Sequence, residues 1–235
     1  MAAVARNRMY LLLAALLAAF VFIGFARTYY LRTLFEVPPI TLLLHAHAIL
    51  FTAWVALFVI QARLIAKQDY RTHMQFGIVG MIVAALVFSV GIASTIASAA
   101  DVRPRPMGMT AAQFTILPAS SILFYGGLVL AGFLLRKRGQ IHKRLMVLAM
   151  IAILGPPAAR LIRAAGLGHD FLVIQMGITA FFVACAITAD WMRHRSLHAV
   201  YTVGGALLIL SWPVRVWFGK TPAWESVGQW MASLN

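Results

Sequence analysis

The stretch ITLLLHAHAILFTAWVALFVIQARLI, residues 40–65, decides the fold because its single charged residue, Arg63, lies close to its end. A helix that crosses the hydrocarbon core of a bilayer needs about 20 mainly apolar residues. Residues 40–65 meet that length, so they predict a membrane-spanning helix. Two histidines, His45 and His47, fall inside this predicted span.

Six other stretches follow the same pattern, each separated from the next by a short segment with charge, proline or glycine. The predicted spans are residues 9–26, 40–65, 78–99, 114–135, 141–162, 171–189 and 199–218. Of the 235 residues, 62% are hydrophobic and 11% are charged, against about 25% charged in a soluble domain. We therefore predict an all-α, polytopic transmembrane helix bundle that forms a single integral membrane domain over residues 1–235. Spans two to five, about residues 40–165, are its expected core.

The net charge of +14 is spread thinly between apolar runs, which argues against a nucleic-acid partner. In a polytopic protein the lysines and arginines instead indicate orientation, because cytoplasmic loops are enriched in them. Twelve of the twenty lie on the side of the N-terminus and eight on the other side. We therefore expect a cytoplasmic N-terminus, a multi-pass protein of the bacterial inner (cytoplasmic) membrane, and the lipid bilayer as its main partner.

Two segments depart from a simple span. Gly155-Pro156-Pro157 lies in the second half of the fifth span, where proline removes a backbone donor and clashes with the preceding turn. A kink or break is predicted there, with either a structural or a functional purpose. After the last span, Thr221-Pro222 predicts the start of an amphipathic helix over about residues 221–235, lying in the outer interface.

The third and fifth spans each open with a histidine after a basic loop. His73 and His142 share a depth because these two helices run in the same direction. In a helix bundle, facing histidines at one depth can hold a haem iron between them. We therefore predict His73 and His142 as the metal ligands of a haem b. The alternative is that both side chains contact lipid headgroups.

A second site is predicted at the opposite depth, around His45 and His47. Residues two positions apart on a helix point in directions about 200° apart, so the side chains of His45 and His47 cannot ligate one metal from the same face. His47 is the third predicted metal ligand. Arg160 and Arg163 share one helix face and suit a carboxylate or a phosphate, such as a haem propionate or a lipid headgroup. The alternative for both arginines is snorkelling to the interface. The candidates that would complete this site are His169 and Met176.

Parts of the chain resemble a family of uncharacterised bacterial multi-pass membrane proteins. The resemblance is carried by residues 61–64, 71–73, Gly77, residues 138–146 and Arg160. In that family a histidine, a basic residue and a glycine open one core helix, and a histidine, two further residues and then Trp-Met open another. Met74 stands here in place of the basic residue and Leu145 in place of Trp. The layout is also similar to cytochrome b561-like membrane haem proteins, which implies transmembrane electron transfer.

The predicted function is therefore a haem b-binding redox protein that passes electrons to or from a quinone or a partner membrane subunit. If it is an enzyme, it is a membrane oxidoreductase, and no catalytic residue is assigned. Two alternatives stay open: a cofactor-free membrane subunit or assembly factor with interfacial histidines, and a small transporter that uses the broken fifth helix. The single cysteine, Cys185, excludes a cysteine-based zinc cage.

Overall fold

The computed structural model describes residues 2–35, 37 and 39–235, with side chains from residue 8 onward. Within these residues, seven helices are long and apolar enough to cross a bilayer, which confirms the all-α class and the seven predicted spans. The spans cover Arg8–Tyr30, Leu42–Ala66, Tyr70–Ala100, Ala111–Leu134, Gly139–Ala164, Gly168–His194 and Ala199–Gly219.

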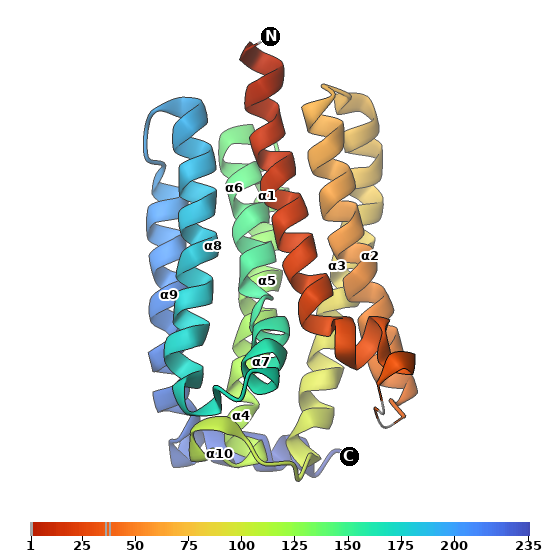
Figure 1. The fold of residues 1–235 in the computed structure, drawn as a ribbon, viewed down its shortest axis with the longest axis vertical. Coiled ribbons are helices and arrows are strands. Elements are labelled where there is room, and N and C mark those ends of the chain that lie inside the picture. The colour runs from red at the N-terminus through yellow and green to blue at the C-terminus, as the bar shows by residue number, and fades with distance from the viewer. Residues whose placement is uncertain (1, 36, 38) are drawn as a thin grey trace.

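The helices run up and down the bundle side by side (Figure 1). The long ones are α1 (Ala2–Phe25), α2 (Leu42–Ala66), α3 (Tyr70–Ala97), α5 (Ile116–Leu134), α6 (Gly139–Ala152), α7 (Gly155–Ala164), α8 (Phe171–His194) and α9 (Ala199–Gly219). We call the end with the N-terminus and the connections 67–69, 135–138 and 195–198 the N-terminal face. The opposite C-terminal face carries α4 (Ala111–Phe114) and α10 (Pro222–Ala232), which lies across the ends of the spans.

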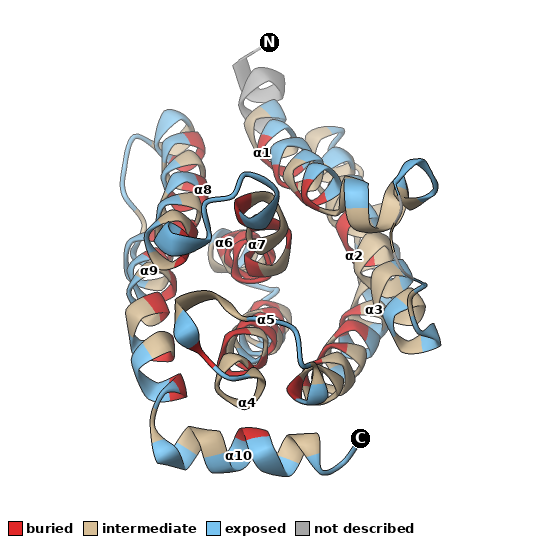
Figure 2. Cartoon of the chain, turned by 60° about the horizontal axis from the view of Figure 1, so that its bottom comes forward, coloured by how far each residue is buried: buried red, intermediate tan, exposed pale blue. Residues whose placement is uncertain are grey.

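The broken span, α6 and α7, lies at the centre of the bundle (Figure 2). It has the largest buried share of the seven spans, and Leu148, Ala149 and Met150 are fully shielded. Helices α1, α5, α8 and α9 all contact it. Helix α2, whose residues are all described, is the most peripheral span and has Trp54 and Val55 as its buried residues. The span with the least regular backbone is therefore the one that its neighbours cover most completely.

The break falls at Gly155-Pro156-Pro157, as predicted. Helix α6 ends at Ala152 and α7 begins at Gly155, because neither proline has an N–H to offer to the carbonyls one turn earlier. Gln175 of α8 donates its Nε2 hydrogen to the Gly155 carbonyl at 3.0 Å. Gly24 of α1 lies so close to Pro157 that a Cβ at this position would collide with the proline ring. Neighbouring helices therefore hold the irregular backbone in place, as a broken helix in a membrane requires.

Helix α10 forms where the sequence predicts it. The side chain of Thr221 caps it by accepting from the backbone N–H of Trp224, and Pro222 occupies the first turn. A Cβ on Gly228 would collide with the backbone of Ala112 in α4, so the glycine permits this close packing. Trp230 stays exposed on the other side of the helix. The arrangement agrees with an amphipathic helix, while its position in the outer interface stays a prediction.

Candidate functional site

The structure brings His73 and His142 together near the N-terminal face. His73 is the fourth residue of α3, and His142 is the fourth residue of α6. In each helix the histidine N–H donates to the carbonyl of the residue just before the helix. The distance is 3.1 Å for His73 to Asp69 and 3.0 Å for His142 to Arg138. The two imidazole rings lie 6.4 Å apart between their centres, with an angle of 76° between their planes. The matching starts of two helices that run in the same direction therefore place both rings at one depth.

The two histidines differ in their hydrogen bonds. Nδ1 of His142 lies 2.8 Å from the carbonyl oxygen of Gly132, so this nitrogen carries the hydrogen and Nε2 is left as an acceptor. Nδ1 of His73 is buried and has no hydrogen-bond partner among the described residues. The side chain of Gln61 donates to the His73 carbonyl at 3.2 Å. The pair thus presents one oriented imidazole and one whose Nδ1 is unused.

Small residues follow His73 along the same face of α3. Gly77, Gly80 and Ala84 lie four, seven and eleven residues further on, which is one stripe of a helix. A Cβ added to Gly80 would meet no described atom within 4 Å, and one added to Gly77 would come no closer than 3.9 Å to Gln61. There is therefore space beside α3 just below the histidine pair.

Other buried polar atoms near this part of the bundle are also unsatisfied. Trp54 of α2 and Tyr125 of α5 meet edge to face with their ring centres 5.2 Å apart. In the described part of the chain, neither Nε1 of Trp54, the hydroxyl of Tyr125, nor Oε1 of Gln61 has a hydrogen-bond partner. Native proteins pair nearly all such groups with protein, water or ligand. Tyr125 could not be singled out before the structure, because an aromatic residue in an apolar span usually belongs to the core.

His45 and His47 contact different elements, as their helical spacing requires. Nδ1 of His47 lies 3.0 Å from the hydroxyl of Ser94 in α3, and its ring stacks on Phe51 at 4.2 Å. His45 instead faces the ring of Tyr29 at 6.0 Å, in the turn after α1. Only His47 therefore points toward α3 and the inside of the bundle.

Arg160 and Arg163 also separate. Arg160 donates to the hydroxyl of Thr28 at 3.2 Å and to the carbonyl of Pro156 at 3.1 Å, and its guanidinium lies over the ring of Phe25 at 4.3 Å. It is near enough to His47 to act on it electrostatically. Arg163 is exposed at the C-terminal face. Arg160 and His47 therefore belong to one region, between α1, α2 and α7.

The two candidates for completing the second site have other partners. His169 pairs with Asp170 at 2.7 Å, and both side chains are exposed. Met176 packs on a hydrophobic cluster around Ile116, Phe171 and Trp212, on the α8 and α9 side. Among the described residues, no group of three or more histidine, cysteine, aspartate and glutamate side chains is placed to hold a metal ion. In the described residues, at most two side chains of these four types therefore lie together in this region.

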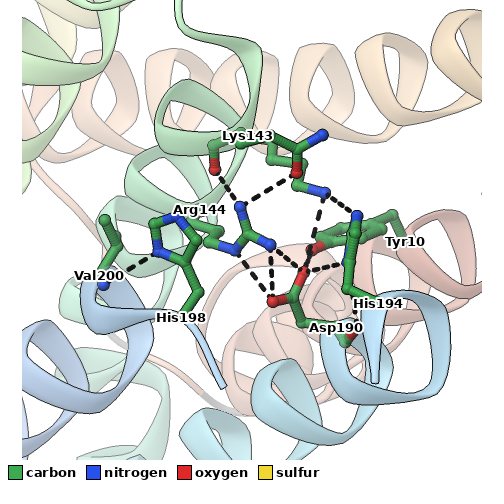
Figure 3. A network of polar contacts seen from close by, with 8 residues as sticks. Tyr10, Lys143, Arg144, Asp190, His194, His198 and Val200 are labelled. Carbon is green, nitrogen blue, oxygen red and sulfur yellow. Dashed lines mark hydrogen bonds and ion pairs between the residues drawn. The ribbon is translucent and has the colours of Figure 1, made fainter. Parts of the chain in front are cut away.

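An ionic cluster that the sequence did not reveal lies near the N-terminal face (Figure 3). Asp190 of α8 accepts from Nε of Arg144 at 3.0 Å and from Nη2 at 2.8 and 2.7 Å. Both side chains are only 2% exposed. The hydroxyl of Tyr10 donates to the same carboxylate at 2.5 Å, while Lys143 and His194 approach it to 3.7 and 3.1 Å. One carboxylate therefore ties together α1, α6 and α8.

A smaller ionic group lies in the loop after α3, outside the spans. Asp101 accepts from Nε of Arg103 at 2.9 Å and pairs with Nη2 of Arg105 at 3.0 Å. The hydrogen bonds from Arg103 hold the pKa of Asp101 well below its usual value. The guanidinium of Arg105 also lies over the ring of Phe114 at 5.2 Å, so the loop packs on α4, at the start of the fourth span.

These features define the class: a multi-pass integral membrane protein, embedded in a lipid bilayer through seven helices of the described chain. No family model, no curated protein and no solved structure matches the chain. The family resemblance and the haem layout inferred from the sequence therefore stay predictions.

Proposed function

We propose that the protein is a haem b-binding redox protein of a membrane, in which His73 and His142 would hold the iron. The observation that carries the proposal is the distance of 6.4 Å between their ring centres. Two imidazoles on opposite sides of one metal ion place their ring centres about 6 Å apart, because each metal–nitrogen bond is about 2 Å long. The pair has this spacing without any rearrangement of α3 or α6.

The hydrogen bonding of the pair supports the proposal. Metal-binding histidines usually donate their other ring N–H to a carbonyl or carboxylate, which fixes the tautomer and the ring orientation. His142 does so through Nδ1 to Gly132. The unpaired Nδ1 of His73, together with the space beside Gly77 and Gly80, is what a bound planar metal-containing group would use. The residues present therefore fit a haem.

When bound, haem supplies one-electron chemistry, and the protein sets its ligation, burial and hydrogen bonding. His73 and His142 would hold the iron. Trp54 and Tyr125 would offer hydrogen-bond donors next to the apolar interior, and the packing of α2, α3 and α5 would exclude water. The N-terminal face would be the cytoplasmic side of a bacterial inner membrane, as the distribution of lysine and arginine predicts.

The electron partner would bind near the C-terminal face, beside His47 and Arg160. A neutral imidazole and a guanidinium can hydrogen-bond the oxygen atoms of a quinone headgroup or hold an anionic group. Arg160 already lies within electrostatic reach of His47 and is oriented by Thr28 and Pro156. We therefore place the proposed quinone or partner-subunit contact here. This proposal does not include His45, Arg163, His169 or Met176, whose role stays a prediction.

The test is a reduced-minus-oxidised visible spectrum of the protein purified from cells supplied with a haem precursor. We expect a b-type spectrum, reduced at least about tenfold in His142→Ala and in Gly80→Leu, which fills the space but keeps both ligands. His169→Ala and Gly127→Leu are the matched controls, because His169 is exposed and Gly127 faces outward from α5. A folded, colourless and iron-free wild-type protein would refute the proposal.

A further inference from the structure

An apolar groove lies between α1 and α8. Its volume is about 210 Å³, and its walls are one face of α1 from Leu16 to Ile23 and one face of α8 with Phe181 and Phe182. Phe182 is buried and meets the ring of Phe20 edge to face at 5.0 Å, so these two rings form the floor. Leu16, Ile23 and Phe181 are exposed, so the groove is open to the surrounding lipid.

The groove lies at the depth where the lipid chains of one leaflet end. Its residues on α8 lie seven to eleven positions after Phe171, the first residue of that helix at the C-terminal face. At about 1.5 Å per residue, this is about 10–17 Å along the helix. Half of the hydrocarbon core of a bilayer is about 15 Å thick. A lipid chain that starts at the C-terminal face would therefore reach the groove with its terminal part.

Helix α7 connects the groove with the C-terminal face. The distance between α1 and α8 increases toward this face, and α7 lies between them (Figure 1). It contacts both helices. Its first turn is next to the groove, because Pro157 packs on Gly24, the neighbour of Ile23. Its last turn carries Arg163, which is exposed. One short helix therefore leads from the end of the groove to a cation at the C-terminal face.

Four arginines of the described chain gather at this end of α7. Arg160 and Arg163 belong to α7, and Arg103 and Arg105 belong to the loop after α3. The charges of Arg163 and Arg103 are near enough to act on Arg160, and the charge of Arg163 also acts on Arg105. Among the described carboxylates, only Asp101 pairs with this group, through Arg103 and Arg105. The cluster therefore has an excess of positive charge, which a nearby anion would reduce.

Arg163 is the member of the cluster that is free to bind such an anion. The other three have the partners given above, whereas no ion pair or hydrogen bond engages Arg163 in the part of the chain that the structure describes. A guanidinium group presents two parallel N–H donors that match the oxygen atoms of a phosphate. An exposed arginine at the end of a membrane span lies at the level of the lipid headgroups, which carry this phosphate.

We propose that α1, α7 and α8 bind one anionic phospholipid of the leaflet at the C-terminal face. Its phosphate binds Arg163 within the positive field of the other three arginines. One of its acyl chains runs over α7 and fills the groove between α1 and α8. A second copy of this chain is a poorer occupant, because its net charge of +14 would add positive charge to the cluster. Neither the groove nor Arg163 belongs to the proposed haem site or to the electron-partner contact, so the test is independent of haem content.

The experiment is native mass spectrometry of the detergent-solubilised protein, titrated with dioleoyl phosphatidylglycerol or dioleoyl phosphatidylcholine. The two lipids have the same chains, but only the first has a net negative charge. We expect the first phosphatidylglycerol to bind at least about fivefold more tightly than the first phosphatidylcholine. Arg163→Gln should remove this preference. Ala19→Trp, which fills the groove, should weaken the binding of both lipids at least about fivefold.

Two matched variants control for the loss of any arginine and for a tryptophan at any lipid-facing position. Arg71→Gln changes an exposed arginine at the N-terminal face, and Ala206→Trp changes an exposed alanine of α9. Both should bind the two lipids as the wild type does. All four substitutions lie at positions that are not buried, and circular dichroism checks that each variant keeps its helix content.

The wild-type protein alone can overturn the proposal, because equal affinities for the two lipids would show that the arginine cluster selects no anionic headgroup. Affinities in Ala19→Trp that stay within about twofold of the wild type would show that no chain lies in the groove. An equal loss of preference in Arg71→Gln would show unspecific attraction of charge. A lipid-free dimer that dissociates in Ala19→Trp would place a second copy in the groove. Each of these results contradicts the proposed lipid site.

Discussion

The ion pair between Arg144 and Asp190 should be the strongest single contact between α6 and α8. Replacing Asp190 by asparagine keeps the size of the side chain but leaves Arg144 buried without its counter-ion. Breaking a buried ion pair by removing one partner costs about 3–5 kcal/mol. The three Arg144–Asp190 hydrogen bonds, at 2.7–3.0 Å, and the Tyr10 hydroxyl at 2.5 Å place this pair at the upper end of that range.

The expected loss can be read as a melting temperature. For a protein of 150–250 residues, 1 kcal/mol corresponds to about 2–4 °C, so Asp190→Asn should lower the midpoint by about 6–20 °C. Thermal unfolding followed by circular dichroism in detergent measures this shift. Asp170→Asn is the control, because Asp170 is exposed at the C-terminal face. We expect it to shift the midpoint by no more than about 4 °C, as for a surface pair of at most about 1 kcal/mol.

A double-mutant cycle separates the interaction energy between Arg144 and Asp190 from the destabilisation that each substitution causes alone. Arg144→Met with Asp190→Leu removes both charges and leaves neither one uncompensated, so the double variant should be more stable than the sum of the two single losses predicts. Among the described residues, Lys143 and His194 are the other basic groups within 4 Å of the carboxylate, and both are partly exposed. An additive cycle, or an Asp190→Asn midpoint within about 2 °C of the wild type, would refute the reasoning.

Two further predictions concern the C-terminal face and the α1–α7 contact. Because hydrogen bonds from Arg103 lower the folded-state pKa of Asp101, their contribution to stability is present above about pH 4 and is lost as the pH falls through the folded-state pKa. The hydrogen–deuterium exchange rate of residues 101–110, corrected for the intrinsic rate at each pH, should therefore rise below about pH 4. Unchanged protection of these amides at pH 2 would contradict this prediction. Gly24→Leu should lower the thermal midpoint strongly because its side chain would overlap Pro157, whereas Gly127→Leu, in open space, should not. Equal midpoints for these two variants would show that α1 and α7 do not pack as described.

The spans and their interruptions could be predicted because they depend on local chemistry. Long apolar runs have no other stable environment than a bilayer, and paired prolines cannot continue a helix. Thr221 before Pro222 similarly predicts a capped helix start, and α10 begins there. His73 and His142 could be paired from the sequence because equal positions in two parallel helices give equal depth. In each of these cases the deciding interaction lies within one helix or follows from its direction.

Burial and partners of the charged residues could not be predicted in the same way. Asp190 lies close to Arg193 and His194 in the sequence, so it looks like part of a solvated helix end. In the fold, Tyr10 and Arg144 come from 180 and 46 residues away and enclose it. Arg215 likewise looks like an interfacial cation near the end of the last span. Only the packing of α5, α6 and α8 around α9 makes it a buried charge.

The two buried arginines also bear on the orientation that the charge count predicts. Arg144 counts with the loops of the N-terminal face and Arg215 with those of the opposite face, yet both side chains are buried in the bundle. Removing one cation from each side leaves the difference unchanged, so the predicted orientation does not depend on them. Their difference is instead in the counter-ion: the chain supplies Asp190 to Arg144 and supplies no described carboxylate to Arg215. A protein that neutralises one buried cation with its own side chain shows that the fold can do so. Arg215 is instead held by the rings of Phe124 and Trp212, 4.9 Å from its guanidinium, and by the hydroxyl of Ser121 at 3.1 Å.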